Sequence, residues 1–373
     1  MSSGEMEIEK YVPDYIANLV PYPPGKPIEE LERQYGVKNP IKLASNENPL
    51  GPSPKAVEAI RKATTNLHRY PDGSAFYLKK ALAEKFQISS EEVVIGNGSD
   101  ELIDLLIRVF IQPGDQCITS HPSFLVYKKR VQSVGGQNII IPLKDFHHDL
   151  TNISRNITDS TRLIFLDNPN NPTGTVISKD DFDKFLRDLP NHILVVLDEA
   201  YMEFCKNTNT PQGIEYLNKD PRVVTLRTFS KAYGLAGLRL GYGIMDKRVT
   251  AYIERVRQPF NVNNLAQQGA IAAIQDTQHL RKTIENTDTG MLTLTNGLTS
   301  IGCKVYPSNT NFLLVDTHLD AKAIYEKMLR KGVIIRSMDA YGFQSFIRIT
   351  IGLPEENELC LKALREVIAE MTS

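Results

Sequence analysis

Short apolar runs rich in β-branched residues recur through the middle of the chain, and helix-like segments such as 100–111 and 179–188 separate several of them. The runs span residues 93–95, 116–119, 162–166, 193–197, 223–226 and 238–244. Short strands that alternate with helices are typical of a mostly parallel sheet with crossover helices. The pattern therefore predicts an α/β fold with a central sheet flanked by helices.

Polar clusters follow five of these runs directly. The clusters occupy residues 96–101, 121–124, 167–174, 198–201 and 227–231. In open parallel sheets, ligands bind in the crevice beyond the carboxyl ends of the strands. We therefore expect the five clusters to meet in one crevice.

The two ends of the chain have different patterns. Six prolines precede residue 45, whereas longer helical segments follow residue 265 and lead to strands at 311–315 and 346–351 and a helix from about 355. A proline-rich stretch of this kind favours an extended arm. The expected parts are an N-terminal arm over 1–40 that packs partly with the small domain, a large domain with the crevice over 41–265, and a small α+β domain over 266–373.

The candidate for chemistry is Lys231, in the stretch 228–239. A lone lysine is usually a surface residue. Here it follows a buried strand, with Ser230 beside it, Arg239 eight residues on, and no acidic residue between 221 and 244. A desolvated lysine near other cations has a lowered pKa and becomes a Schiff-base nucleophile. With a phosphate neighbour, these features predict a pyridoxal phosphate site.

A phosphate site is expected at the start of the helix that follows residue 97. Backbone N–H groups of Gly98, Ser99 and Asp100 would point into the crevice, where a helix N-terminus favours an anion. A nicotinamide-binding Gly-x-Gly-x-x-Gly motif is the alternative, but Glu101 stands where its third glycine would be.

Asp198 ends an apolar run, so its carboxylate is expected on the crevice floor. Asp198 is either a helix cap or turn residue, or the anion that keeps a pyridine nitrogen protonated. Asn171 offers an amide donor for the phenolic oxygen of such a ring, and Tyr201 can reach the same side.

Two further side chains each have two possible roles. Phe124 either packs in the core or stacks on a cofactor ring. Arg348 lies in an apolar strand, where it either pairs with a structural carboxylate or binds a substrate anion bidentately.

Four further residues are interpreted as surface positions, because no ligand at metal-site spacing accompanies them. They are His147, His148, Glu199 and Glu203, and no metal is expected.

Composition narrows the class of partner. The 373 residues carry a net charge of −1, so neither nucleic acid nor an anionic membrane surface is indicated. The four cysteines include no Cys-x-x-Cys pair, and the charged N-terminus does not resemble a signal peptide. These observations predict a cytoplasmic protein that acts on small molecules.

Taken together, the motifs resemble those of fold-type I pyridoxal phosphate enzymes, and within them the histidinol-phosphate aminotransferases. The likeness covers nearly the whole chain. It is carried by residues 21–27, 44–51, 69–72, 168–174, 198–201, 228–231, 237–239 and 347–350. Each motif alone is weak, but their order and spacing are highly specific.

The resemblance implies a role for each cofactor-side residue. Lys231 would form the Schiff base, Asp198 would hold the pyridine nitrogen, and Asn171 and Tyr201 would hold the phenolic oxygen. The phosphate cradle would consist of Ser99, Asp100, Ser230, Arg239 and, from the second subunit of a homodimer with shared sites, Tyr70. The ring-stacking position is usually tyrosine in this family and is Phe124 here.

The resemblance also implies the substrate side and the reaction. Arg348, Arg336, Tyr22 and Asn48 would line the substrate side. The implied reaction interconverts L-histidinol phosphate and 2-oxoglutarate with imidazole acetol phosphate and L-glutamate. The alternatives are an aromatic-amino-acid aminotransferase or an amino-acid-phosphate decarboxylase on the same scaffold, and, more distantly, a non-catalytic cofactor-binding regulator.

Overall fold

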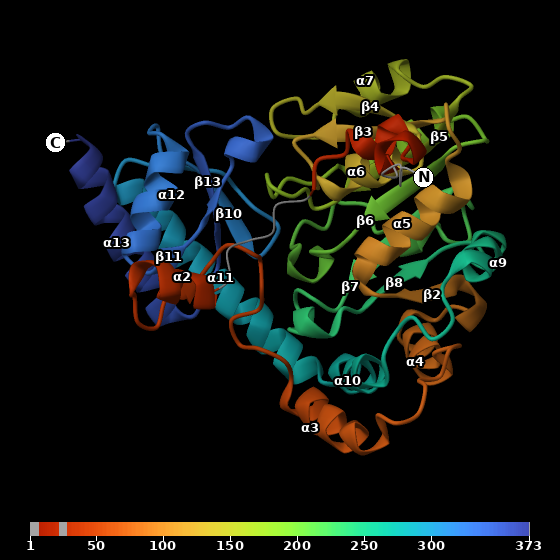
Figure 1. The fold of residues 1–373 in the computed structure, drawn as a ribbon, viewed down its shortest axis with the longest axis horizontal. Coiled ribbons are helices and arrows are strands. Elements are labelled where there is room, and N and C mark those ends of the chain that lie inside the picture. The colour runs from red at the N-terminus through yellow and green to blue at the C-terminus, as the bar shows by residue number, and fades with distance from the viewer. Residues whose placement is uncertain (1–6, 22–27, 373) are drawn as a thin grey trace, which may run out of the picture.

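Seven strands form the larger sheet of the computed structural model, which describes residues 7–21 and 28–372 (Figure 1). The strands are β2 (Val93–Gly96), β3 (Gln116–His121), β4 (Gln137–Pro142), β5 (Thr161–Asp167), β6 (Leu194–Asp198), β7 (Val223–Thr228) and β8 (Gly241–Ile244). Their order in the sheet is β2-β8-β7-β6-β5-β3-β4. Only β8 runs against its neighbours among these strands, so the predicted mostly parallel sheet is confirmed.

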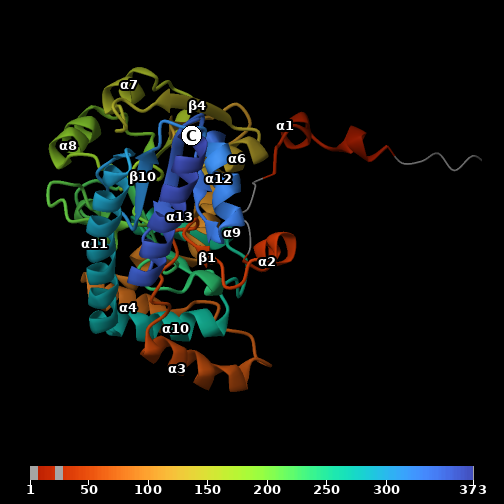
Figure 2. The same ribbon diagram turned by 90° about the vertical axis from the view of Figure 1, so that its left-hand side faces the viewer.

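Helices cover both faces of this sheet (Figures 1 and 2). The helices of this larger part are α3 (Pro54–Ala63), α4 (Phe76–Phe86), α5 (Gly98–Phe110), α6 (Val126–Ser133), α7 (Leu150–Arg155), α8 (Lys179–Asp188), α9 (Lys247–Val256) and α10 (Asn264–Gln275). Strands β5, β6 and β7 are almost wholly buried, as expected for strands covered on both faces.

A second sheet lies beside the first and is antiparallel. Its strands, in the order β12-β13-β10-β9, are β12 (Arg336–Ser337), β13 (Phe346–Thr350), β10 (Phe312–Asp316) and β9 (Lys304–Val305). The accompanying helices are α11 (Thr277–Ser300), α12 (Ala321–Arg330) and α13 (Pro354–Thr372). We call this part the small domain.

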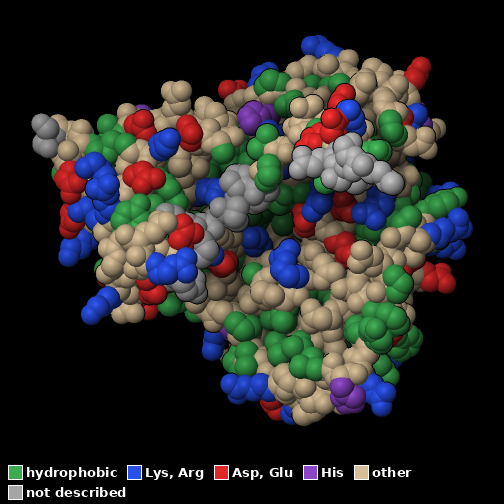
Figure 3. Space-filling view, viewed as in Figure 1, with side chains coloured by type: hydrophobic (Ala, Val, Ile, Leu, Met, Phe, Trp, Pro, Cys, Tyr) green, Lys and Arg blue, Asp and Glu red, His purple; other side chains and the backbone are tan. Residues whose placement is uncertain are grey.

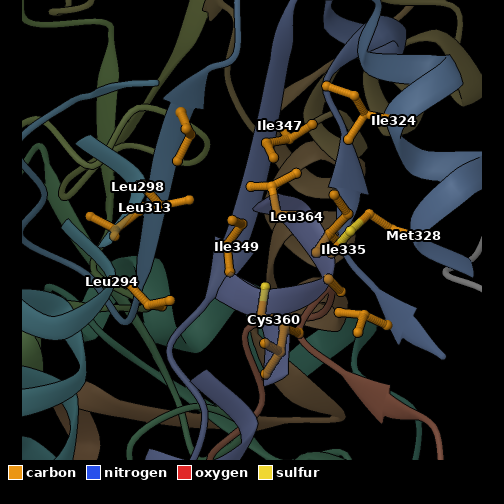
Figure 4. Packing of buried hydrophobic residues seen from close by; sticks show 14 of the residues in the cluster. Leu294, Leu298, Leu313, Ile324, Met328, Ile335, Ile347, Ile349, Cys360 and Leu364 are labelled. Carbon is orange, nitrogen blue, oxygen red and sulfur yellow. The ribbon is translucent and has the colours of Figure 1, made fainter. Parts of the chain in front are cut away.

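The small domain has its own apolar core (Figure 4). Side chains from α11, α12 and α13 meet those of the sheet, including Leu298, Ile324, Leu364, Leu313 and Ile349. Alternate residues of β13 point into this core, which leaves Arg348, between Ile347 and Ile349, on the opposite face. The core therefore fixes the position of β13, whose opposite face carries the charged side chain of Arg348.

One segment connects the small domain to the larger sheet. β1 (Ile41–Lys42) pairs in parallel with β11 (Val333–Ile334), and Thr350 N donates to Leu43 O at 2.9 Å. A few residues on, Asn48 Nδ2 donates to Ala232 O at 3.0 Å, in the larger part. The chain thus crosses between the two parts over residues 43–48, inside the range predicted to belong to the large domain alone. The domain boundaries stay a prediction.

The N-terminal region contains short helices in addition to extended chain. They are η1 (Ile8–Tyr11), α1 (Asp14–Ala17) and α2 (Ile28–Tyr35). α1 lies against α6, where Gln132 Nε2 donates to Tyr15 O at 3.2 Å, and α2 lies against α12 of the small domain. In the part of the chain that the structure describes, we find no helix with the length and hydropathy needed to span a membrane.

Candidate active site

The carboxyl ends of β2, β3, β5, β6 and β7 lie along one edge of the larger sheet, because the antiparallel β8 separates β2 from β7. The beginning of β8, next to Arg239, faces the same edge. A cavity of about 440 Å³ opens there, between the sheet edge and the small domain. Twelve predicted site residues line it: Gly98, Ser99, Asp100, Phe124, Asn171, Asp198, Tyr201, Ser230, Lys231, Arg239, Arg336 and Arg348.

Lys231 lies three residues beyond the end of β7 and is partly buried in the cavity wall. Its Nζ donates a hydrogen bond to Ser45 O at 2.9 Å. Burial, followed by the positive charge of Arg348, lowers the pKa of the Lys231 amine to about 8. At pH 7 about a tenth of such an amine is neutral, which is the form that attacks a carbonyl carbon.

Asp198 is the last residue of β6, and its side chain is buried. Tyr127 Oη donates to Asp198 Oδ2 at 2.7 Å, whereas the buried Oδ1 has no hydrogen-bond partner among the residues described. Burial raises the pKa of Asp198 to about 7. A buried carboxylate oxygen without a donor is costly, so the cavity suits a cationic donor at Oδ1.

Tyr127 links Asp198 to the candidate stacking residue. Its ring is stacked on Phe165, with centroids 4.7 Å apart, and meets Phe124 edge-on at 5.5 Å. The hydroxyl thus orients Asp198 while the ring edge supports Phe124. No sequence signal singled out Tyr127, because an aromatic residue near the start of a helix is ordinary core packing.

The start of α5 forms the anion-binding end of the cavity. Gly98 has a φ of +71°, and a Cβ there would lie 2.7 Å from Arg239 Nη2, so glycine lets the guanidinium approach the helix terminus. Arg239 Nη1 donates to Ser230 Oγ at 3.5 Å. The Asp100 carboxylate pairs with Arg130 at 3.2 Å. Asp100 therefore offers an anion its backbone N–H and not its side chain.

Arg336 and Arg348 form the opposite wall. They lie directly opposite each other on the antiparallel strands β12 and β13. Arg348 is buried and donates to Asn171 Oδ1 at 2.5 Å and to Ala44 O at 2.8 Å. Like charges directly opposite in a sheet are destabilising, and an anion between them relieves this repulsion.

The segment Ala44–Asn46, which the sequence analysis did not single out within 44–51, contacts three predicted site residues. Ala44 O and Ser45 O accept from Arg348 and Lys231, and Asn46 Nδ2 donates to Tyr201 Oη at 2.8 Å. Asn46 is in the left-handed region, with a φ of +55°. Asparagine tolerates this conformation, but sequence alone cannot tell which asparagine of Asn-Glu-Asn adopts it.

Two predicted site residues lie elsewhere. Asn48 is buried outside the cavity lining, and its Nδ2 donates to Ala232 O and to Thr283 Oγ1, both at 3.0 Å. Tyr70 is 82% exposed and stacks on Phe260, with centroids 4.9 Å apart, away from the cavity of its own chain. Tyr22 lies outside the described residues.

The interpretation of His148 as a surface residue is wrong. Its side chain is 2% exposed. Nδ1 lies 2.7 Å from Ser120 Oγ, and Nε2 lies 3.1 Å from Asp167 O. These two bonds satisfy both ring nitrogens, and only His147 of the pair is exposed.

The interpretation of Glu199 and Glu203 as surface residues is also wrong. Glu199 is fully buried, and its Oε2 accepts from Arg227 Nε at 2.8 Å. Glu203 lies 3.8 Å from the same guanidinium. Burial alone would lower the pKa of Arg227, but the negative charge of Glu199 outweighs this effect and raises the pKa above its ordinary value. The three residues form an ion cluster, and Lys85 adds a further positive charge near Glu203.

Comparisons with known proteins agree on one family. Residues 38–364 match the model of the family described as aminotransferase class I and II. The chain is 48% identical over 370 residues to the histidinol-phosphate aminotransferase of Desulfotalea psychrophila, with 98% of each chain covered. It is 45% identical to that of Moorella thermoacetica, covering 95% of this chain and 92% of the relative.

The fold is similar to that of a solved relative. The crystal structure of histidinol-phosphate aminotransferase from Sinorhizobium meliloti in complex with pyridoxal-5′-phosphate superposes with a TM-score of 0.89 at 30% sequence identity. The alignment covers 96% of this chain and 98% of that one.

Proposed function

Because this chain belongs to the aminotransferase class I and II family, we propose that it transfers an amino group reversibly between L-histidinol phosphate and 2-oxoglutarate, a step of histidine biosynthesis. The products are imidazole acetol phosphate and L-glutamate, and the cofactor is pyridoxal 5′-phosphate. The names of relatives that are 45% and 48% identical over nearly the whole chain support this choice. The predicted cytoplasmic location stays a prediction.

The proposal is carried by the placement of cations on two sides of one cavity that Lys231 also lines. Arg239 and the start of α5 lie at one end, and the paired Arg336 and Arg348 lie at the other. Such a cavity suits two anionic groups, one on a cofactor and one on a substrate. A half-buried lysine with a lowered pKa is the group expected in the middle.

The residues present fit pyridoxal phosphate. The unpartnered Oδ1 of Asp198 would accept from the pyridinium, and the α5 terminus with Ser230 and Arg239 would hold the phosphate. Asn171 and Tyr201 would hold the phenolic oxygen, and Phe124 would stack on the ring. When bound, this cofactor supplies a conjugated ring that takes up the electron pair released at the substrate Cα.

Lys231 would hold and move the proton. With its pKa near 8, the amine can accept a proton from the substrate Cα and return one from the same position. Ser45 O, at 2.9 Å, gives the protonated amine an acceptor that keeps it at the cavity wall.

The paired arginines would bind the substrate's anionic end. Arg348 would bind the phosphate of histidinol phosphate and, when glutamate is the substrate, its α-carboxylate. One arginine would have to bind both groups, because histidinol phosphate has no carboxylate. Arg336 lies directly opposite Arg348 and adds a second positive charge. A phosphate interacts more strongly with two such charges than a single carboxylate does.

The test is a comparison of substrates in wild type and Arg336→Ala. A charge-assisted contact contributes about 1.5–3 kcal/mol, so kcat/KM for histidinol phosphate should fall by roughly ten- to a hundredfold. The value for phenylalanine should fall less. Equal losses for both substrates, or a wild-type preference for phenylalanine, would favour an aromatic-amino-acid aminotransferase.

We further propose that two copies of this chain form a dimer with shared sites. A patch of exposed hydrophobic side chains supports this proposal, and Figure 3 shows hydrophobic side chains gathered over α4. The patch consists of Leu67, Tyr70, Phe76, Tyr77, Tyr252 and Phe260. Exposed apolar patches of this kind mark interaction surfaces. Tyr70, pointing away from its own cavity, would reach the phosphate in the neighbour's site.

Mixing two defective variants tests the shared site. Subunits carrying Tyr70→Phe, combined with subunits carrying Lys231→Ala, should yield hybrid dimers in which one site has both defects and the other has neither. Activity should then rise above that of both parents. If subunit exchange is demonstrated and activity does not rise, the shared-site proposal fails.

A further inference from the structure

A tight turn between β4 and α7 places a bulky side chain in a left-handed conformation. Lys144 and His147 exchange two backbone hydrogen bonds, each of 2.9 Å, around Asp145 and Phe146. The φ angles of these two central residues are +49° and +64°. Turns of this shape favour asparagine or glycine at both positions. Phenylalanine there is strained, and such strain persists only where surrounding contacts hold it.

The contacts that hold Phe146 come from the small domain. Its ring centroid lies 4.6 Å from that of Tyr306, 5.9 Å from that of Phe343 and 6.0 Å from that of Phe346. On the side of the larger sheet, Thr175 Oγ1 donates to Phe146 O at 2.7 Å. The Phe146 backbone is therefore bound to one part of the molecule, while its ring packs against the other.

The aromatic cluster that receives Phe146 supports the strands that carry the paired arginines. Phe346 begins β13, two residues before Arg348, and its carbonyl accepts from Met338 N at 3.0 Å, two residues after Arg336. Tyr341, a further member of this cluster, also lines the cavity. A shift of this cluster would move both arginines relative to the larger sheet.

We propose that Phe146 is a positioning residue, which fastens the small domain to the larger sheet and so sets the distance between the paired arginines and Lys231. The inference deepens the proposed function, on which it rests for the identity of the substrates. Phe146 touches neither the cavity nor a reacting group. Its effect is expected mainly on the binding of the substrate's anionic end, because the cofactor contacts proposed within this chain come from the larger part of the molecule.

The variant that isolates this role is Phe146→Asn. Asparagine tolerates the left-handed turn, so the backbone is kept and only the aromatic contacts are removed. KM for both histidinol phosphate and glutamate should rise, on the order of tenfold, because small misplacements far from the chemistry weaken binding and turnover by up to about a hundredfold. The Kd of pyridoxal phosphate should stay within about twofold of wild type. Asp145→Asn, in the same turn, is the matched control and should leave both values unchanged.

A purely structural role predicts a different result. If Phe146→Asn weakens cofactor binding as much as substrate binding, or leaves both KM values unchanged, the positioning role is refuted. If Phe146→Asn does not fold, Phe146→Leu is assayed in the same way. Leucine keeps an apolar contact, so we expect a smaller rise in KM.

Amide hydrogen exchange separates this inference from the proposed function. In the cofactor-free protein, amides of β12 and β13 should exchange faster in Phe146→Asn than in wild type or Asp145→Asn. Inactivity of wild type towards histidinol phosphate would refute the proposed function alone. Unchanged exchange of these two strands would refute the fastening role, whatever the substrate.

Discussion

Two basic side chains four residues apart, Arg227 and Lys231, have opposite surroundings. Arg227 is buried between Glu199 and Glu203, and its pKa is raised. Lys231 is partly buried beside Arg348, with the carbonyl of Ser45 as acceptor, and its pKa is lowered to about 8. Burial is common to both. Arg227 is hydrogen-bonded to a carboxylate, which makes it a structural cation. Glu47 raises the pKa of Lys231 only through its charge, and burial together with Arg348 outweighs this effect, which leaves the amine reactive.

The largest expected effect comes from removing the reactive cation. Lys231→Ala should lower transamination by at least ~10²–10⁴-fold, because the general base is lost. Steady-state rates and absorbance of the cofactor-loaded protein measure this, with the exposed Lys219→Ala as control. The variant should still bind the cofactor through the α5 terminus. Full activity of Lys231→Ala without added amine would contradict the role of the residue.

Removing the structural cation, Arg227, should lower the stability of the protein and leave kcat nearly unchanged. Arg227→Met leaves Glu199 buried without its cation, which should lower the free energy of unfolding by about 3–5 kcal/mol. Urea unfolding measures the loss, and kcat of the folded protein should stay within a few-fold of wild type. Adding Glu199→Leu should restore part of the stability, because an apolar pair replaces an unpaired buried charge. A large loss of kcat with unchanged stability would contradict the comparison.

The smallest effect is a pH dependence of stability to which Lys231, and not Arg227, should contribute. Its pKa in the folded, cofactor-free protein is about 8, below the ordinary value of 10.5, so between these values the unfolded chain binds more protons. The free energy of unfolding therefore rises with pH across this window, by at most about 1.4 kcal/mol per unit of pKa shift and by less for a partly exposed group. Arg227 contributes no such slope, since a guanidinium stays protonated.

The measurement compares wild type with Lys231→Met by urea unfolding at pH 8 and pH 10. The stability advantage of the methionine variant should shrink as the pH rises, because the penalty for burying the charged amine disappears. An advantage that is equal at both pH values would show that Lys231 is fully solvated.

Features encoded locally could be predicted from the sequence. Polar residues directly after apolar runs are expected at strand ends, and nine of the twelve predicted residues that line the cavity come from such clusters, Lys231 and Asp198 among them. The strand β4 was not predicted. Its apolar core, residues 139–141, is as short as the run 93–95, but glutamine, asparagine and proline flank it at the sheet edge.

Features that depend on distant partners could not be predicted. Tyr127 and Asp198 are 71 positions apart, and His148 and Ser120 are 28 apart, so nothing near either residue reveals the bond. The choice between Asn46 and Asn48 depends on which one meets Tyr201. Sequence spacing fixes what lies at a strand end, whereas these contacts depend on how separate elements pack.

The bond from Asn46 N to Thr350 Oγ1 joins residues 304 positions apart, and it fixes the order in which the site can be assembled during synthesis. Ribosomes add about 5–20 residues per second, so Asn46 waits on the order of 15–60 s for its partner. The larger sheet, complete by Ile244, can form much earlier. Until β13 has emerged, Lys231 lacks Arg348 beside it and the small-domain wall of its cavity, so the site is completed long after the lysine itself has been made.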